Sequence, residues 1–208
     1  MIFNSFEFAI FFPVVFAIYW MLRLRAQNIF LLLASYLFYG FWDWRFLSLI
    51  LFSTVVDYIV AQKIHASDVQ SVRKRWVTLS LVTNLGLLGV FKYFNFFLDS
   101  FVDVMAAVGL QANVPSLQII LPVGISFYTF QTLSYTIDVY RKDNKPVTNI
   151  VDFAVYVAYF PQLVAGPIER AANMLPQFAD GPKQSIQKTL DGIDLCVRGY
   201  FKKVVIAD

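Results

Sequence analysis

The residues best suited to chemistry lie on one stretch, Leu117–Arg141, which carries no charged side chain between Leu117 and Ile137. The run is long enough to cross a bilayer as a helix, which takes about 20 apolar residues. Small and polar residues recur in it at spacings that share one helix face: Gly124, Tyr128, Gln131, Tyr135, Asp138 and Lys142. Phenols and amides cost free energy in hydrocarbon unless they are hydrogen-bonded. We therefore expect this stripe to face protein, and two interpretations stay open, a helix–helix contact and a cavity or tunnel wall.

Two further groups invite a chemical interpretation. His65 is the only histidine, and no second histidine, cysteine or carboxylate stands near it at metal-ligand spacing, so it indicates a solvated loop residue. Asp57 falls inside an apolar segment, where an ionisable group is a functional hypothesis. Because Lys63 follows it closely, we favour a side chain that reaches the inner membrane surface.

The remaining candidates are equally open to structural interpretations. Asp99 and Asp103 share a helix face and are expected to form its wet side. Residues 84–89 (NLGLLG) lack the Lys-Ser/Thr of a phosphate-binding loop, so the two glycines indicate close helix contact. Arg170 fits either an anion ligand or an ordinary basic residue that ends a membrane segment.

The composition is typical of a polytopic membrane protein. Of 208 residues, 58% are hydrophobic and only 15% are charged, against about 25% charged in a soluble domain. The net charge of +3 is clustered between apolar segments and does not indicate a nucleic-acid partner. A single cysteine, Cys196, excludes an internal disulfide and a metal-thiolate cluster. The first basic residues follow the first apolar run, which is the reverse of a secretory signal peptide.

The apolar segments and their breaks predict the elements. Four membrane spans are expected at Phe8–Leu22, Ala26–Trp42, Phe46–Gln62 and Trp76–Phe91, with a basic loop at Lys63–Arg75 and a turn at Ala112–Pro115. Amphipathic patterns predict a helix partly in the interface at Tyr93–Leu110 and a surface helix within Gly181–Lys203. The whole chain is expected to be one all-α membrane domain.

One apolar segment, Ile150–Ile168, is interrupted by Pro161, Gly166 and Pro167 and predicts a bent or re-entrant segment. The basic loops place the N-terminus outside and those loops in the cytoplasm. Ile150–Ile168 then enters and leaves on the same side. A further apolar run begins at Val204 and the sequence ends at Asp208, so we expect a span that starts and is not completed.

Four stretches in this order resemble the membrane-bound O-acyltransferases, specifically the alginate O-acetyltransferase branch. They are FKYFNFF (91–97), LPVGISFYTFQTLSYTIDVYR (121–141), YFPQLVAGPIER (159–170) and GYFKKVVIAD (199–208). The resemblance runs from Met1 to Asp208 and implies the N-terminal part of one such domain, in a bacterial inner membrane. It further implies a ring of helices around a tunnel, through which an acyl group passes from a cytoplasmic thioester, such as acetyl-CoA, to the outer side. An extracytoplasmic acetyltransferase partner would then complete O-acetylation of an exported polysaccharide.

The resemblance also assigns residues. The residues that match its two central motifs, expected to line or brace the tunnel, are Tyr128, Gln131, Ser134, Tyr135, Asp138, Pro161, Gln162, Gly166, Pro167 and Arg170. The family's catalytic histidine is expected beyond Asp208, and His65 does not match it. The chain alone is therefore expected to be inactive, and neither a metal nor a bound cofactor is expected.

Alternatives remain for the function. The same family resemblance is compatible with transfer of D-alanine to teichoic acid, or of acetyl to peptidoglycan. A non-enzymatic membrane scaffold or transporter component is an interpretation from another class.

Overall fold

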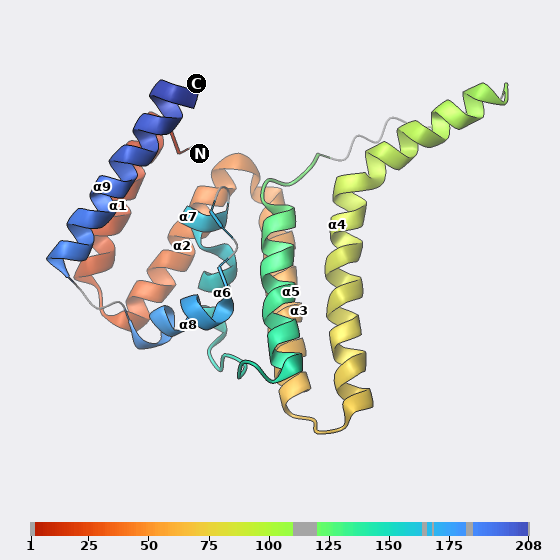
Figure 1. Ribbon diagram of the computed structural model, residues 1–208, viewed down its shortest axis with the longest axis horizontal. Helices are drawn as coiled ribbons and strands as arrows, with labels where there is room; N and C mark the ends of the chain where they lie inside the picture. The colour runs from red at the N-terminus through yellow and green to blue at the C-terminus, as the bar shows by residue number, and fades with distance from the viewer. Residues whose placement is uncertain (1–2, 110–119, 164–165, 168, 182–184, 208) are drawn as a thin grey trace.

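The computed structural model describes residues 3–109, 120–163, 166–167, 169–181 and 185–207, and every regular element in these ranges is helical (Figure 1). The chain begins with α1 (Phe6–Met21), α2 (Leu24–Asp43), the 3₁₀ turn η1 (Trp44–Phe46), α3 (Leu47–His65) and α4 (Gln70–Ala107). It continues with α5 (Ile125–Arg141), α6 (Ile150–Ala158), α7 (Phe160–Leu163), α8 (Ala171–Asp180), α9 (Ile186–Phe201) and the π-helical η2 (Lys202–Ala207). The expected all-α class is confirmed.

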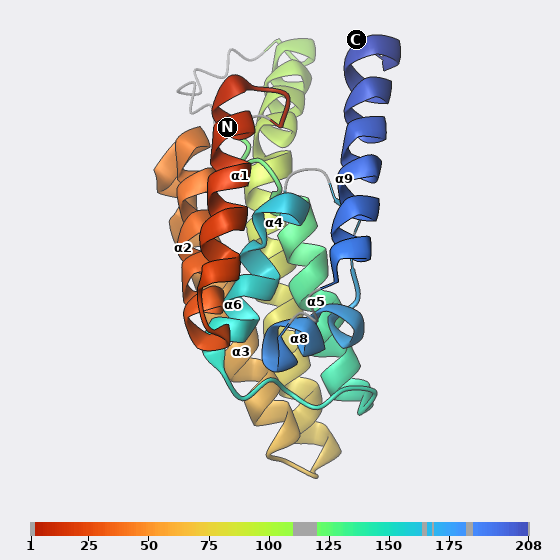
Figure 2. The same cartoon turned by 90° about the vertical axis from the view of Figure 1, so that its left-hand side faces the viewer.

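The helices form two packed groups. Helices α3, α4 and α5 pack on one another along their lengths, and α2, α6 and α8 form the neighbouring group (Figure 1). Helix α1 packs against α2, whereas α9 stands apart from α1 in the second view (Figure 2) and has no buried residue. The Tyr200 hydroxyl of α9 donates a hydrogen bond to the Phe3 carbonyl, which links this helix to the start of the chain.

The outer surfaces of the long helices are apolar. Two described stretches, Leu24–His65 and Gln70–Ala107, are long and apolar enough to cross a membrane, judged by length and composition. Helices α2 and α3 within the first stretch each run about 30 Å at 1.5 Å per residue, close to the hydrocarbon thickness of a bilayer. Large apolar side chains on α2 point outward, among them Leu33 and Leu37. The buried core is mainly hydrophobic but also contains polar side chains, among them Asp57, Asn84 and Gln131.

Helix α4 corrects two predictions. The basic loop predicted at Lys63–Arg75 is shorter, because α3 continues to His65 and α4 already begins at Gln70. No proline or glycine occurs in that stretch to stop a helix. The predicted fourth span and the separate interfacial helix at Tyr93–Leu110 are both parts of the single helix α4, which bends and leaves the bundle toward its end (Figure 1). Leu110 and the turn predicted at Ala112–Pro115 lie outside the described residues.

Breaks in the other two apolar stretches are where prolines and glycines predict them. Within Leu117–Arg141 the helix starts only at Ile125, after Pro122 and Gly124, and residues 117–119 lie outside the described ranges. In Ile150–Ile168 the helix stops at Ala158, and α7 resumes at Phe160. The bend between them at Tyr159 has φ −54° and ψ 106°, which is not helical. Tyr159 lies two residues before Pro161, and Pro161 falls in the first turn of α7, where its missing backbone N–H leaves no helix hydrogen bond unmade.

Asp57 is not at the membrane surface. Its side chain is fully buried among α3, α4 and α5, so the prediction that it reaches the inner surface is wrong. It accepts hydrogen bonds from the Ser80 hydroxyl, from Asn84 Nδ2 (2.8 and 3.1 Å to its two oxygens) and from Thr136 Oγ1 (3.4 Å). The Ser53 hydroxyl donates to Asn84 Oδ1 (2.7 Å) and so turns the amide nitrogen toward Asp57. We name these five residues the Asp57 cluster.

The Asp57 cluster joins the three helices through buried hydrogen bonds. In the described part of the chain no basic side chain forms an ion pair with Asp57. The carboxylate therefore depends on neutral donors from two other helices, and those donors in turn depend on it. Nearby Gly86 and Gly89 of α4 have no atom within 4 Å of a built Cβ, so the expected close helix contact at the NLGLLG segment is wrong.

Replacing Asp57 by leucine is expected to lower the free energy of unfolding by about 3 kcal/mol. The substitution leaves the buried hydroxyls of Ser80 and Thr136 without their acceptor, while Asn84 Nδ2 keeps only its bonds within α4, such as that to the Ser80 carbonyl (3.0 Å). Thermal or denaturant unfolding in detergent micelles, followed by circular dichroism, measures the loss. The matched control is Thr54→Val, because that buried hydroxyl bonds only to the Ile50 carbonyl of its own helix. A loss from Asp57→Leu no larger than that from Thr54→Val would contradict the assigned role.

Candidate functional site

The polar stripe of α5 faces helix α6. Gln131 is buried and its Nε2 donates to the Tyr156 carbonyl at 2.7 Å, while the Tyr156 hydroxyl lies 3.5 Å from the Gln131 carbonyl. The Tyr135 hydroxyl accepts from the Val147 amide at 3.0 Å, and its ring packs on Phe153 with centroids 4.6 Å apart. We name this contact the α5–α6 seam. Of the two interpretations of the stripe, the helix–helix contact is the one observed for these residues.

Side chains of the seam and of α2 pair with backbone groups that the helix breaks release. Besides the Tyr156 carbonyl, the Phe160 amide after the Tyr159 bend donates to the Ser35 hydroxyl of α2 at 3.2 Å. The Tyr39 hydroxyl donates to the Val123 carbonyl just before α5, at 2.9 Å. Unpaired backbone groups are costly away from water. The buried hydroxyls and the amide of Gln131 therefore make the broken segments tolerable in an apolar setting.

The two motif regions touch directly at Gly124. Its φ of +76° lies in the left-handed region that favours glycine, and a Cβ built there would lie 2.7 Å from the Leu163 carbonyl oxygen. The backbone before α5 thus packs against the backbone at the end of α7 with no room for a side chain. Further along, a Cβ at Gly166 would lie 2.7 Å from Gln162 Cα. Both glycines are needed because backbone approaches too closely for any larger residue.

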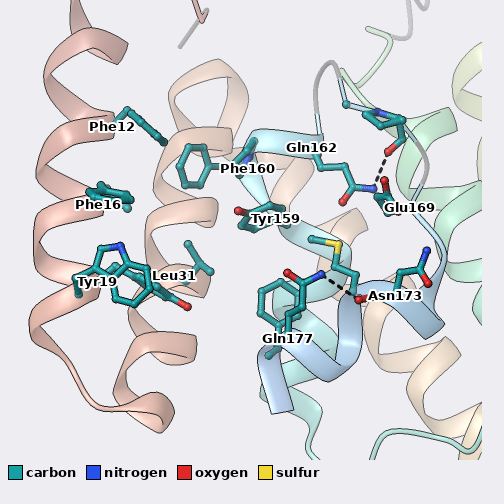
Figure 3. A pocket seen from close by; sticks show the side chains of 17 residues that line it. Phe12, Phe16, Tyr19, Leu31, Tyr159, Phe160, Gln162, Glu169, Asn173 and Gln177 are labelled. Carbon is teal, nitrogen blue, oxygen red and sulfur yellow. Dashed lines mark hydrogen bonds between the residues drawn. The ribbon is translucent and has the colours of Figure 1, made fainter. Parts of the chain in front are cut away.

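A cavity of about 590 Å³ opens between α1, α2 and the α6–α8 region. Its volume falls in the range of small-molecule pockets, about 300–1,000 Å³. Figure 3 shows Phe12, Phe16 and Tyr19 of α1 on one side, facing Tyr159 and Phe160 across the space. These aromatic residues form an apolar wall. The α1 wall continues as a ladder spaced by four residues, with ring centroids 5.8 Å apart for Phe8–Phe12, 6.2 Å for Phe12–Phe16 and 6.1 Å for Phe16–Trp20.

Polar side chains line the cavity opposite α1. They are Gln162, Glu169, Asn173 and Gln177 (Figure 3). Gln162 Nε2 donates to the Pro167 carbonyl at 2.8 Å and holds the turn after α7 closed, and Gln177 Nε2 donates to the Asn173 carbonyl at 3.0 Å. Within the described residues the Glu169 carboxylate and the Asn173 side chain have no hydrogen-bond partner, so they are free to meet a ligand. An apolar aromatic wall opposite hydrogen-bonding groups suits a ligand with an apolar and a polar end.

The residues predicted for the site divide between these two places. Pro161, Gln162, Gly166 and Pro167 line the cavity. Those of the first motif do not line it and belong to α5, where Gln131 and Tyr135 are buried in the seam and Ser134 and Asp138 are half-buried. Arg170 precedes α8 and is exposed, outside the cavity lining. Lys142, predicted as the last residue of the stripe, is instead exposed at the C-cap of α5.

Tyr128 and Asp138 have different surroundings from the residues of the seam. The Tyr128 hydroxyl is buried and has no hydrogen-bond partner among the described residues. Asp138 Oδ2 accepts from Asn144 Nδ2 at 3.3 Å, which fixes the start of the loop after α5. His65 is exposed, as predicted, but it is the last residue of α3 and not a loop residue. Among the described residues no group of three or more histidine, cysteine or acidic side chains is arranged to hold a metal ion.

Sequence reasoning missed the walls that α1 and α8 contribute to the cavity. The spacing of Phe8, Phe12, Phe16 and Trp20 is a visible signal, because residues four apart share a helix face. The polar pair Asn173 and Gln177 has the same spacing in α8. Neither pattern says which other element each face meets, so the cavity itself was not predictable.

Comparison with known proteins identifies homologues of this chain. Over 210 aligned positions the chain is 41% identical to a probable alginate O-acetylase, AlgI, of Pseudomonas aeruginosa, and 40% identical to the protein of the same name of Azotobacter vinelandii. Each alignment covers 100% of this chain. The chain is a homologue of the alginate O-acetylases. This confirms the resemblance to the alginate O-acetyltransferase branch of the membrane-bound O-acyltransferases.

The homology extends to a second modification and covers part of each relative. The chain is 36% identical over 241 positions to a peptidoglycan O-acetyltransferase of Helicobacter pylori. It spans 40% of the Pseudomonas aeruginosa relative, 42% of that from Azotobacter vinelandii and 45% of that from Helicobacter pylori. No protein-family model and no solved structure matches this O-acetylase homologue.

Gly124→Ala is expected to destabilise this O-acetylase homologue by about 2 kcal/mol or more, since the added methyl meets the Leu163 carbonyl and the left-handed φ is strained. Gly86→Ala is the control, because Gly86 is helical with open space around it and alanine favours the helix by about 0.5–1 kcal/mol. Apparent melting temperatures of both variants in the same detergent give the comparison. If both substitutions shift the melting temperature upward, the close contact at Gly124 is not formed.

Proposed function

We propose that this chain forms part of an O-acetyltransferase that acetylates an exported polysaccharide of the alginate type. The observation that carries the proposal is the identity of about 40% across all of its residues to proteins named alginate O-acetylase. The packing adds support, because two segments that resemble family motifs meet at Gly124 and Leu163, and the second motif lines a cavity of ligand size. The peptidoglycan O-acetyltransferase relative makes peptidoglycan the second candidate acceptor.

The protein works, in this proposal, as a multi-pass protein of the bacterial inner membrane. Apolar outward faces on the long helices support this placement, and the charge of the connecting segments supports an N-terminus on the outer side. Helices α6 and α7 have nine and four residues, or about 14 and 6 Å of rise, too short to cross about 30 Å of hydrocarbon. They form a re-entrant segment between α5 and α8. The amphipathic α9 and the outer end of α4 lie at the membrane interface.

The cavity holds part of a substrate on its way across the membrane. We assign it the acyl end of a cytoplasmic thioester, acetyl-CoA or a similar donor, because aromatic walls accept an acyl group and side-chain amides accept its polar attachment. The acetyl group then reaches an extracytoplasmic acetyltransferase partner, which transfers it to the polysaccharide. Gln131, Ser134, Tyr135 and Asp138 brace the wall through the seam, and Tyr128 and Arg170 border the same segments. Nothing in this arrangement makes these groups the base that activates an acceptor hydroxyl.

A chimera tests the activity. The matched region of the Pseudomonas aeruginosa relative is replaced by this chain, in a strain whose own copy of that gene is deleted. Exported alginate is expected to carry O-acetyl groups, detected by proton NMR or by a hydroxylamine assay. A chimera that reaches the membrane in the same amount as the parent, yet yields unacetylated alginate, would contradict the proposal.

The cavity is tested in the same strain with Gln162→Leu. Losing the bond to the Pro167 carbonyl displaces the turn that lines the cavity, and a shift of about 1 Å near a substrate can cost up to about 100-fold in rate. We expect alginate acetylation to fall by about tenfold. The control is Gln187→Leu on α9, where the exposed amide pairs only with Asp191 of the same helix. Equal acetylation in the two variants would mean that the cavity has no role in acetyl transfer.

A further inference from the structure

One end of the molecule is strongly basic. Residues 63–75 and 141–145 together hold seven cationic side chains and two carboxylates. The turn between α3 and α4 and the C-terminal end of α5 lie at the same end of the molecule (Figure 1). We name these two segments the basic end. Its cations are Lys63, Arg73, Lys74, Arg75, Arg141, Lys142 and Lys145, and its carboxylates are Asp68 and Asp143.

Hydrogen bonds hold the two basic segments together. Arg73 is 5% exposed, and its Nη2 donates to the carbonyls of Val139 and Tyr140, which are among the last of α5. Its guanidinium also lies 5.5 Å from the centre of the Tyr140 ring. Gln70 Nε2 donates to the Tyr140 hydroxyl at 2.8 Å. The start of α4 is thereby fixed on the end of α5, and their exposed cations share one surface.

Among the described residues, no ion pair neutralises the positive charge of this surface. The ion pairs in the described part of the chain, Arg45 with Asp43 and Arg198 with Asp194, lie elsewhere. Six of the seven cations are exposed, and the buried one, Arg73, has an Nε without a hydrogen-bond partner. At the opposite end of α3, by contrast, Asp43 holds Arg45 through three side-chain hydrogen bonds. An uncompensated group of cations attracts an external anion.

We propose that the basic end binds the phosphodiester headgroups of anionic membrane lipids. Arginine and lysine form charge-assisted hydrogen bonds with phosphate oxygens, and basic segments beside membrane spans attract anionic lipid. Apolar side chains that face outward, Ile59 of α3 and Leu79 of α4, lie one to two turns from these cations. A phospholipid would place its phosphate on the cations and its chains on that apolar surface.

Soluble phosphate compounds fit the basic end less well. None of its residues lines either described cavity, so the cations lie on an open rim rather than around an enclosed cradle. Cations spread over an open surface can contact several lipid headgroups that a bilayer holds in place. They do not surround a single small anion. The inference rests on the membrane placement proposed above, and it adds a lipid class to that placement.

Native mass spectrometry of the 208-residue chain tests the inference. The purified protein in detergent receives equal amounts of phosphatidylglycerol and phosphatidylcholine with identical acyl chains, and the ratio of the two bound lipids is measured. The unmodified protein is expected to favour phosphatidylglycerol by about fivefold or more. The variant Lys74→Gln, Arg75→Gln, Lys145→Gln is expected to fall below about twofold, because three charges are removed from the rim.

The control variant Lys92→Gln, Lys188→Gln, Lys202→Gln removes the same charge from exposed positions elsewhere and is expected to keep the preference. Circular dichroism checks that both variants remain helical, and if the first is misfolded, Lys145→Gln alone must still lower the ratio. An unchanged ratio in the basic-end variant, or an equal fall in the control, overturns the inference. Displacement of the lipid by millimolar inorganic pyrophosphate overturns the lipid assignment in favour of a soluble phosphate site.

Cell fractionation separates this inference from the one on which it rests. A chain found in the membrane fraction without lipid preference overturns only the lipid site. A chain found in the soluble fraction overturns the membrane placement, and the lipid site with it.

Discussion

Every backbone group released by a helix break must find a partner inside the protein, and this constraint governs the arrangement around α6 and α7. The Tyr156 carbonyl and the Phe160 amide flank the bend at Tyr159, and they are met by the Gln131 amide from α5 and the Ser35 hydroxyl from α2. In an apolar environment these partners cannot be replaced by water. The position of the broken segment is therefore fixed by side chains of two unbroken helices on either side of it.

The same constraint gives the two sides of the broken segment different roles. Gln131 and Tyr135 of the polar stripe of α5 are buried in packing contacts, so this amide and this phenol brace the broken segment. The other side of that segment faces α1, and there the turn after α7 lines a space with aromatic and polar walls. A rigid seam behind a cavity wall keeps the wall in one position. In the acyl transfer proposed above, such positioning matters more than new chemistry in this part of the chain.

Much of this organisation is readable in the sequence, but for identifiable reasons some is not. Helical periodicity located the stripe at Gln131 and Tyr135, and prolines and glycines located the breaks, because both depend on local geometry. Asp57 was misplaced because its partners, Ser80, Asn84 and Thr136, come from other helices and no local pattern links them. The cavity could not be predicted for the same reason, because the α1 and α8 residues that line it come together only through tertiary packing. The loop at Lys63–Arg75 was predicted from its charged residues alone. Charged residues do not end a helix, so most of this segment is helical.

We propose that α6 and α7 enter and leave on one side of the membrane, held there by the seam. Single-cysteine labelling with a membrane-impermeant thiol reagent in intact cells and in inverted vesicles tests it most directly, after Cys196, the only cysteine, is replaced by serine. Asn149→Cys before α6 and Asp180→Cys at the end of α8 are expected to label only from the cytoplasmic side, and Trp44→Cys only from the outside. Labelling of positions 149 and 180 from opposite sides would mean that the segment crosses the membrane, and the account given for the seam and the cavity would be wrong.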